Sequence, residues 1–61
     1  MSIILDTTKE NGFRYQLRKV ANKFVIFSLD TRGIASYAEW SEEMIFNNEE
    51  KAIATFKKLF L

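Results

Sequence analysis

Few side chains in this 61-residue chain could catalyse a reaction. The chain has no His and no Cys, so the commonest general base and the thiol nucleophile are both missing. Ser41 has no base in an obvious motif, and the adjacent Glu42 and Glu43 would point to opposite faces of a strand. The two glycines, Gly12 and Gly33, are isolated and cannot form a phosphate-binding loop. We therefore expect a protein that is not an enzyme.

Metal and cofactor sites are equally unsupported by the residue types present. Without Cys or His the chain can form neither a disulfide nor a Cys/His zinc site. The carboxylates do not have the alternating spacing of a calcium-binding loop. We expect no metal and no cofactor, and no small-molecule substrate is evident.

One group of residues could instead bind a macromolecule. It combines two arginines with apolar and aromatic side chains: Arg14, Arg18, Val20, Phe24, Ile26 and Tyr37. Mixed basic and aromatic residues on an open sheet face can bind single-stranded nucleic acid by stacking and phosphate contacts. An apolar patch with aromatic residues and Arg is also typical of protein interfaces. If the strand register differs from the one expected below, Phe24 and Ile26 belong to the core.

These residues would be positioned by strands that the turn signals separate. Asn11-Gly12 is a strong hairpin signal, and Asp30 with Gly33 favours a second turn. We expect four strands, at Ser2–Thr8, Phe13–Val20, Phe24–Leu29 and Ile34–Trp40. Residues 41–46 remain ambiguous between an edge strand at Met44–Phe46 and a helical turn capped by Ser41. Trp40 is expected to anchor the core at the end of the sheet.

The C-terminal segment has the clearest pattern, which predicts a helix over Asn48–Phe60. Asn47 is the expected cap, with Glu50 three residues on in a capping-box-like arrangement. Acidic residues begin this segment and lysines end it, as the helix dipole prefers. The apolar residues fall on one stripe at three- and four-residue spacing: Ala52, Ile53, Phe56, Leu59 and Phe60.

The turn "KVANKF" decides which face of the sheet the helix covers. A two-residue loop would place Leu17 opposite Ile26. A three-residue loop places Leu17 opposite Phe27 and, across the next turn, Val25 opposite Ala38. We expect the three-residue loop because register follows the hydrophobic pattern. It gathers the apolar residues of two strands on one face: Phe13, Tyr15, Leu17, Val25, Phe27 and Leu29.

Charge, hydropathy and Cys content indicate in which compartment the protein acts. The net charge of +1 suggests no partner by itself. No apolar run approaches the roughly 18 residues that span a membrane, and the first residues lack the basic start of a signal peptide. The absence of Cys fits a reducing compartment. We expect a cytoplasmic protein without a membrane segment.

Together these patterns predict a single α+β domain spanning residues 1–61. Its architecture would be a three- to five-stranded antiparallel β-meander with one C-terminal α-helix packed on one face. The expected function is a small binding module acting through the exposed sheet face on a protein partner or by forming a homodimer. Inhibitors, adaptors and phage-type accessory proteins are analogous small domains. Weak nucleic-acid binding through the same face is the alternative.

Residues 22–60 show one faint resemblance to a known family. The pattern "NKF…RG…W…F…EEKAIATFKKLF" is similar to the WGR domain, a small β-rich module associated with nucleic-acid proteins, whose helix begins F-x-x-x-E-E-x-A. Here Trp40 is followed by Ser41-Glu42 rather than Gly-Arg, and the loop after it is shorter than in that family. The motif that defines the family is therefore missing, and membership does not follow.

Overall fold

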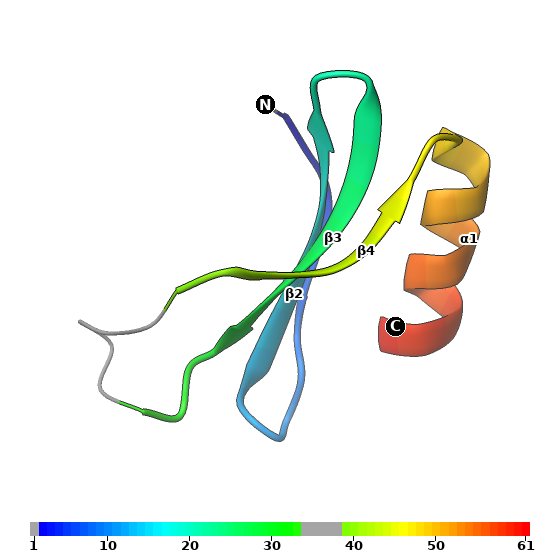
Figure 1. Cartoon of the computed structure of the whole chain (residues 1–61). Coiled ribbons are helices and arrows are strands. Elements are labelled where there is room, and N and C mark those ends of the chain that lie inside the picture. The colour runs from blue at the N-terminus through cyan, green and yellow to red at the C-terminus, as the bar shows by residue number, and fades with distance from the viewer. Residues whose placement is uncertain (1, 34–38) are drawn as a thin grey trace.

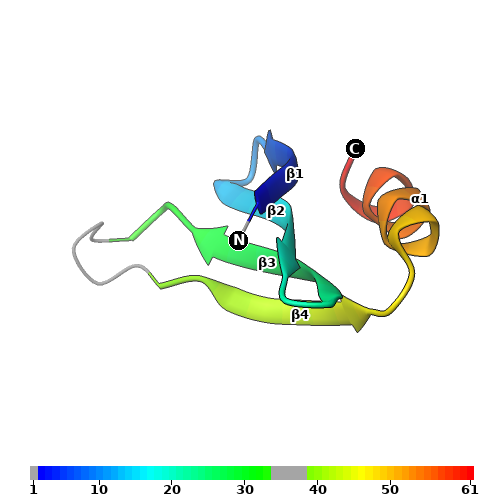
Figure 2. The same cartoon turned by 90° about the horizontal axis from the view of Figure 1, so that it is seen from above.

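The computed structural model describes residues 2–33 and 39–61. Within these ranges the chain forms strands β1 (Ser2–Thr8), β2 (Phe13–Val20), β3 (Lys23–Asp30) and β4 (Ser41–Phe46), and helix α1 (Glu49–Phe60). The strands make one antiparallel sheet in the order β1-β2-β3-β4. The sheet is strongly twisted, and α1 lies against one side of it (Figure 1, Figure 2). The predicted α+β fold, an antiparallel meander with one C-terminal helix, is confirmed.

The turn between β1 and β2 forms where Asn11-Gly12 predicts it. Gly12 has φ +92°, a left-handed conformation that glycine adopts without steric cost. The backbone N–H of Phe13 donates to the Asn11 side chain at 3.0 Å, which satisfies one of the turn's amides. The two strands pair from Ser2 opposite Lys19 to Thr8 opposite Arg14, with a β-bulge between Ile3 and Leu5.

The turn between β2 and β3 is shorter than expected, and the register prediction is wrong. Val20 pairs with Lys23, so only Ala21 and Asn22 form the loop, and Leu17 lies opposite Ile26. Ala21 adopts φ +55°, which type II′ turns require at this position but which a residue with a side chain rarely takes. One residue of slip exchanges the two faces of β3 relative to the expectation.

The strand that pairs with β3 on the edge away from β2 is also not the expected one. Val25 lies opposite Ile45 of β4, so the predicted contact between Val25 and Ala38 is wrong. Most of the expected strand Ile34–Trp40 lies outside the described residues, and its last two residues precede β4 without belonging to a strand. The ambiguous segment 41–46 is therefore a strand. A second β-bulge follows Ile26 in this pairing.

Helix α1 begins one residue later than predicted, because Asn48 and not Asn47 is its cap. The Asn48 side chain accepts a hydrogen bond from the Lys51 N–H at 3.0 Å and has an extended backbone, as N-cap residues do. Asn47 instead accepts a hydrogen bond from the Lys23 ammonium. Leu59, predicted on the buried stripe, is 49% exposed.

The core lies between α1 and one face of the sheet. Its buried members come from three elements: Leu17, Phe24, Ile26, Ala52 and Phe56. Half-buried apolar residues surround this cluster, among them Met44 and Phe46 of β4. α1 packs against β2, β3 and β4.

The C-terminal end of α1 is held to the β1–β2 hairpin by one cation and one aromatic pair. The Lys9 ammonium donates to the Phe60 carbonyl at 2.8 Å, which satisfies a helix-terminal acceptor. The Phe60 ring stacks on Tyr15 of β2 with centroids 4.1 Å apart. These contacts fix where the helix ends relative to the sheet.

Candidate functional site

The face of the sheet away from α1 carries arginines next to aromatic and apolar side chains, and we call it the helix-free face. Side chains alternate between the two faces of a strand, so residues in phase with Arg14 and with Val25 lie on it. Strand pairing brings the members side by side: Ile3, Asp6, Arg14, Gln16, Arg18, Val20, Val25, Phe27 and Ile45.

The structure divides the predicted site residues between the two faces. Arg14, Arg18 and Val20 lie on the helix-free face, as expected. Phe24 and Ile26 do not join them, because the two-residue turn rotates both toward α1, where they are 9% and 0% exposed. Their predicted exposure is therefore wrong. Tyr37, the remaining member, lies outside the described residues.

An apolar row crosses the helix-free face. In register across the four strands it runs through Ile3, Arg18, Val25 and Ile45, so three of its four members are apolar and the fourth is an arginine. Val25 is 4% exposed although it is not part of the cluster under α1, whereas Ile3 and Ile45 at the two edges are each 59% exposed. An antiparallel sheet usually presents polar residues to water on its uncovered face. The exposed apolar side chains in this row are therefore Ile3 and Ile45 at its two ends, which the helix does not cover, whereas Val25 between them is buried.

Aromatic rings and guanidinium groups lie together beside this row. The Arg18 guanidinium carbon is 4.5 Å from the centroid of the Phe27 ring and 4.5 Å from that of Trp40. The Arg14 guanidinium lies 5.6 Å from the Trp40 ring. Such cation–π contacts hold the flat guanidinium groups against the rings. Trp40, predicted to anchor the core, is half-buried beside these arginines on the helix-free face.

A polar network fixes the two arginines. Arg14 donates to both carboxylate oxygens of Asp6, at 3.1 and 2.6 Å, and Gln16 donates to the same carboxylate at 2.8 Å. Arg18 donates to the Gln16 side-chain oxygen at 2.7 Å, so the 3%-exposed Gln16 is satisfied at both ends. The hydrogen bond from Arg14 lowers the pKa of Asp6 and raises the pKa of Arg14. These hydrogen bonds thus hold both arginines in fixed orientations.

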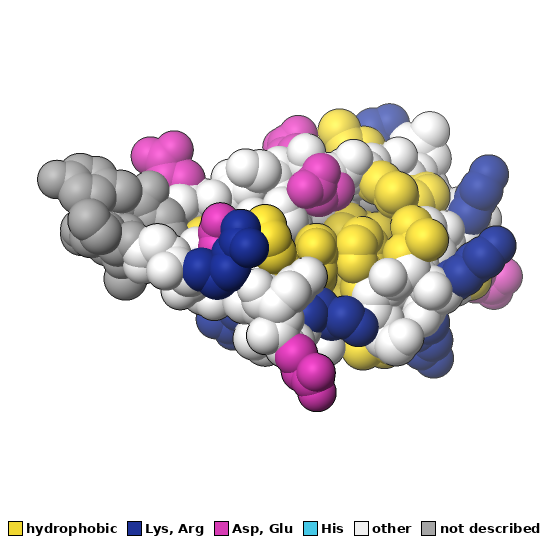
Figure 3. Space-filling model, turned by 90° about the horizontal axis from the view of Figure 1, so that it is seen from below, with side chains coloured by type: hydrophobic (Ala, Val, Ile, Leu, Met, Phe, Trp, Pro, Cys, Tyr) yellow, Lys and Arg dark blue, Asp and Glu magenta, His cyan; other side chains and the backbone are white. Residues whose placement is uncertain are grey.

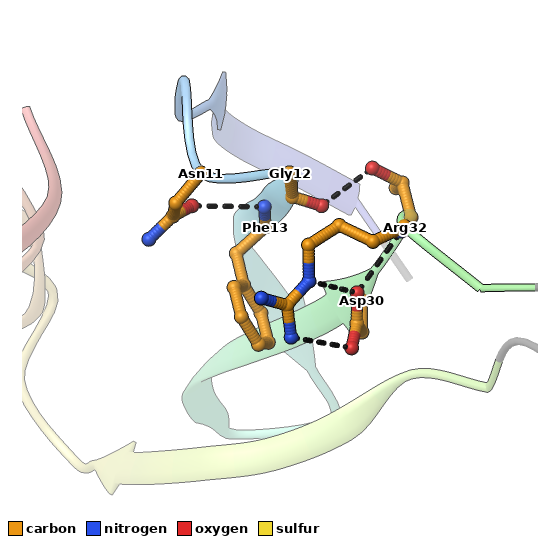
Figure 4. A network of polar contacts seen from close by, with 6 residues as sticks. Asn11, Gly12, Phe13, Asp30 and Arg32 are labelled. Carbon is orange, nitrogen blue, oxygen red and sulfur yellow. Dashed lines mark hydrogen bonds and ion pairs between the residues drawn. The ribbon is translucent and has the colours of Figure 1, made fainter.

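A second polar cluster ties the β1–β2 turn to the end of β3 (Figure 4). Arg32 donates to both oxygens of the Asp30 carboxylate at 3.0 Å. The Arg32 side chain also covers the Phe13 ring, 4.7 Å from its centroid, and the Thr31 N–H donates to the Gly12 carbonyl at 2.9 Å. Hydrogen bonding from Arg32 lowers the pKa of Asp30 to about 2. This cluster links the β1–β2 turn to the chain that follows β3.

Sequence reasoning missed the residues that surround the arginines, namely Ile3, Val25, Phe27, Trp40 and Ile45. The signal that would have found them is the two-residue loop, because in that register Val25 and Phe27 fall in phase with Arg14 and Arg18. The basic and aromatic character of the face was predicted, but with the wrong aromatic residues.

Residues 2–33 and 39–61 contain no group of three or more acidic side chains placed to hold a metal ion. Within the same ranges, α1 is too short and too polar to cross a membrane. Comparison with known protein families, with curated proteins and with solved structures found no match to this chain.

Proposed function

We propose that this chain is a non-enzymatic binding module whose helix-free face docks on a protein partner. The observation that supports this most is the apolar row, with Ile3 and Ile45 each 59% exposed at its ends. The neighbouring Arg and aromatic side chains are of the types most enriched at interface hot spots. The lack of Cys is compatible with the cytoplasm as the place of action.

The size of this face indicates the class of interaction. Strands lie about 4.8 Å apart and rise about 3.3 Å per residue, so four strands of about seven residues cover roughly 19 by 23 Å. The projected area of this face is thus about 440 Å². In a standard interface each partner buries more, about 800 Å² of accessible surface. The proposed complex therefore belongs to the small, transient class.

Nucleic acid is a weaker alternative for the same surface. The Arg14 charge is already paired with Asp6, and the Arg18 guanidinium already covers the Phe27 and Trp40 rings on which a base would stack. The net charge of +1 adds little long-range attraction for phosphates. A protein partner, which needs apolar contact more than free cations, suits the face better.

The test uses two matched variants. Ile45→Lys places a charge in the apolar row, whereas Leu59→Lys places the same charge on the exposed surface of α1, where Leu59 is 49% exposed. A protein captured from a cell lysate by the wild-type chain is purified and titrated against all three forms by calorimetry. We expect Ile45→Lys to weaken binding by roughly 2 kcal/mol, as loss of an interface hot spot does, and Leu59→Lys to leave it unchanged.

Three results would contradict the proposal. One is that no purified protein binds the wild-type chain, and another is that both variants bind as well as wild type. The third is tight binding of a labelled single-stranded oligonucleotide that weakens steeply as salt is added, which would favour nucleic acid. Circular dichroism of each variant checks that the fold is retained.

A further inference from the structure

The turn between β1 and β2 places an asparagine directly before a glycine, at Asn11-Gly12. Asn11 is exposed and lines a groove of about 480 Å³ that opens to solvent. The turn is the lowest part of the sheet in Figure 1, and Figure 3 views the molecule from that end, where charged and hydrophobic side chains share the surface. Water therefore has access to the Asn11 side chain.

An asparagine in this position can modify itself by a reaction with its own backbone. The Gly12 nitrogen loses its proton to base and attacks the side-chain carbonyl carbon of Asn11. A bond forms between that nitrogen and Cγ, the bond from Cγ to Nδ2 breaks, and Nδ2 takes up a proton and leaves as ammonia. Water then opens the resulting succinimide ring at one of its two carbonyl carbons, which gives aspartate or isoaspartate. Glycine favours the attack because it has no Cβ to crowd the nitrogen.

Two hydrogen bonds of the folded turn oppose this reaction. The Gly12 N–H donates to the Lys9 carbonyl at 3.1 Å, so the attacking nitrogen holds its proton. The Asn11 side-chain oxygen accepts from the Phe13 N–H at 3.0 Å, and Figure 4 shows the side-chain nitrogen turned away from Phe13. Both bonds must break before the Gly12 nitrogen and the side-chain carbon can meet. Each bond of this kind shifts an equilibrium roughly fivefold.

We propose that Asn11 is a self-modifying site, which the native turn holds back and which local opening of the hairpin releases. The reaction consumes one water and releases one ammonia, and it requires no oxidant, reductant or cofactor. Because the turn must open first, the extent of modification records how often the β1–β2 hairpin opens. No partner takes part, so the inference does not depend on the function proposed above.

The isoaspartate product has a structural consequence at the end of β3. It routes the main chain through the former side chain, so the backbone before Gly12 becomes one carbon atom longer. The Gly12 carbonyl accepts from the Thr31 N–H at 2.9 Å, and a Cβ added at Gly12 would lie 2.2 Å from the Arg32 Cγ. Gly12 therefore has no room to shift toward Arg32. The longer backbone should break the tie between the turn and Thr31.

The test follows deamidation of the full purified chain at mildly alkaline pH, with and without enough urea to unfold it. Cleavage after Lys9 and Arg14 releases a peptide, residues 10–14, in which Asn11 is the only asparagine. Mass spectrometry measures the mass gain of this peptide, and chromatography separates its aspartate and isoaspartate forms. We expect modification in the folded chain to be about tenfold or more slower than in urea, because both hydrogen bonds must break first.

The other asparagines provide an internal control in the same samples. Each precedes a residue with a side chain: Asn22, Asn47 and Asn48. In urea, Asn11 should be modified faster than any of them. Asn11→Gln keeps a side-chain amide but would have to close a larger ring, so this variant should show no comparable mass gain at position 11.

A matched variant separates the added charge from the longer backbone. Asn11→Asp carries the aspartate product, and its carboxylate can still accept from the Phe13 N–H. We expect this variant to keep a urea midpoint close to that of wild type. The isolated isoaspartyl chain should instead have a lower midpoint and faster hydrogen exchange at the Thr31 amide.

Three outcomes would overturn the inference. One is that Asn11 stays unmodified in the urea-unfolded chain, and another is that the folded and unfolded chains are modified at equal rates. The third is an isoaspartyl chain whose urea midpoint and Thr31 exchange match those of wild type.

Discussion

Two isoleucines on opposite faces of the sheet give a direct test of the register. Ile26 is fully buried under α1, whereas Ile45 is 59% exposed on the helix-free face. We expect Ile26→Ala to lower the free energy of unfolding by about 2–5 kcal/mol, because the substitution leaves a cavity in the core. Ile45→Ala should change it by about 0.5 kcal/mol or less, as exposed substitutions do.

The loss expected for Ile26→Ala is large relative to the total free energy of unfolding. At about 0.05–0.15 kcal/mol per residue, a chain of 61 residues has roughly 3–9 kcal/mol of stability. Urea denaturation followed by far-ultraviolet circular dichroism measures both variants. With a slope near 1 kcal/mol per molar urea, the midpoint should fall by about 2 M or more for Ile26→Ala. For Ile45→Ala it should fall by about 0.5 M or less.

Equal effects, or a larger effect at Ile45, would refute the reasoning. Equal effects would mean that the two isoleucines do not differ in burial as described. A larger effect at Ile45 would mean that the helix covers the face carrying Val25 and Phe27, as a three-residue loop between β2 and β3 would require. If the purified Ile26→Ala variant is fully unfolded, the result would agree with the expected loss of stability. The predicted loss approaches the lower estimate of the total stability.

Two further predictions concern single polar groups. Asn48→Ala should cost about 1 kcal/mol in unfolding free energy, because the Lys51 N–H loses its acceptor; Asn47→Ala should cost clearly less, and equal urea midpoints for the two would contradict the cap assignment. Arg32 lowers the pKa of Asp30 from 3.8 to about 2, so the stability this carboxylate contributes is complete above pH 3.8 and is lost as the pH falls through about 2. As the pH falls from 3.8 to about 2, the Asp30→Asn variant should therefore lose less stability than wild type. Parallel curves of urea midpoint against pH for the two proteins would count against the Asp30–Arg32 pairing.

Local signals in the sequence were sufficient for the fold class. Asn11-Gly12 predicted the first hairpin, and the three- and four-residue spacing of apolar residues predicted α1 to within one residue. Both signals act over a few residues and depend on backbone chemistry that tertiary packing does not override here. The helix cap was displaced by one position because two asparagines stand in succession, and either side chain can accept a hydrogen bond from the first turn.

The register could not be obtained in the same way. Phe24, Val25, Ile26 and Phe27 are apolar in succession, so the pattern of β3 allows either phase to face the helix. The alignment of apolar residues favoured the wrong choice, because a three-residue loop places Val25, Phe27 and Leu29 on the same face as Leu17. The two-residue loop that forms needs a positive φ at Ala21, which costs a residue with a side chain about 1–2 kcal/mol. Burial of Phe24 and Ile26 under α1 outweighs that local strain.

The candidate site shows how an error in register propagates. Arg14, Arg18 and Val20 follow from the alternation within β2 alone, and they were placed together correctly. Their aromatic neighbours come from β3 and from the residue before β4, so identifying Phe27 and Trp40 required both the register and the position of the last strand. Contacts between distant segments are the part of a site that short-range patterns do not predict.

The hydrogen bond from Lys9 to the Phe60 carbonyl has a kinetic consequence. It joins positions 51 residues apart in the sequence, whereas the first three strands are connected by short turns. The entropy lost on closing a loop grows with its length, so the two hairpins should form early and the contact between Lys9 and Phe60 late. An interaction that is absent from the folding transition state slows unfolding without speeding folding. This one ammonium group would therefore lengthen the lifetime of the folded chain while leaving the rate at which it forms nearly unchanged.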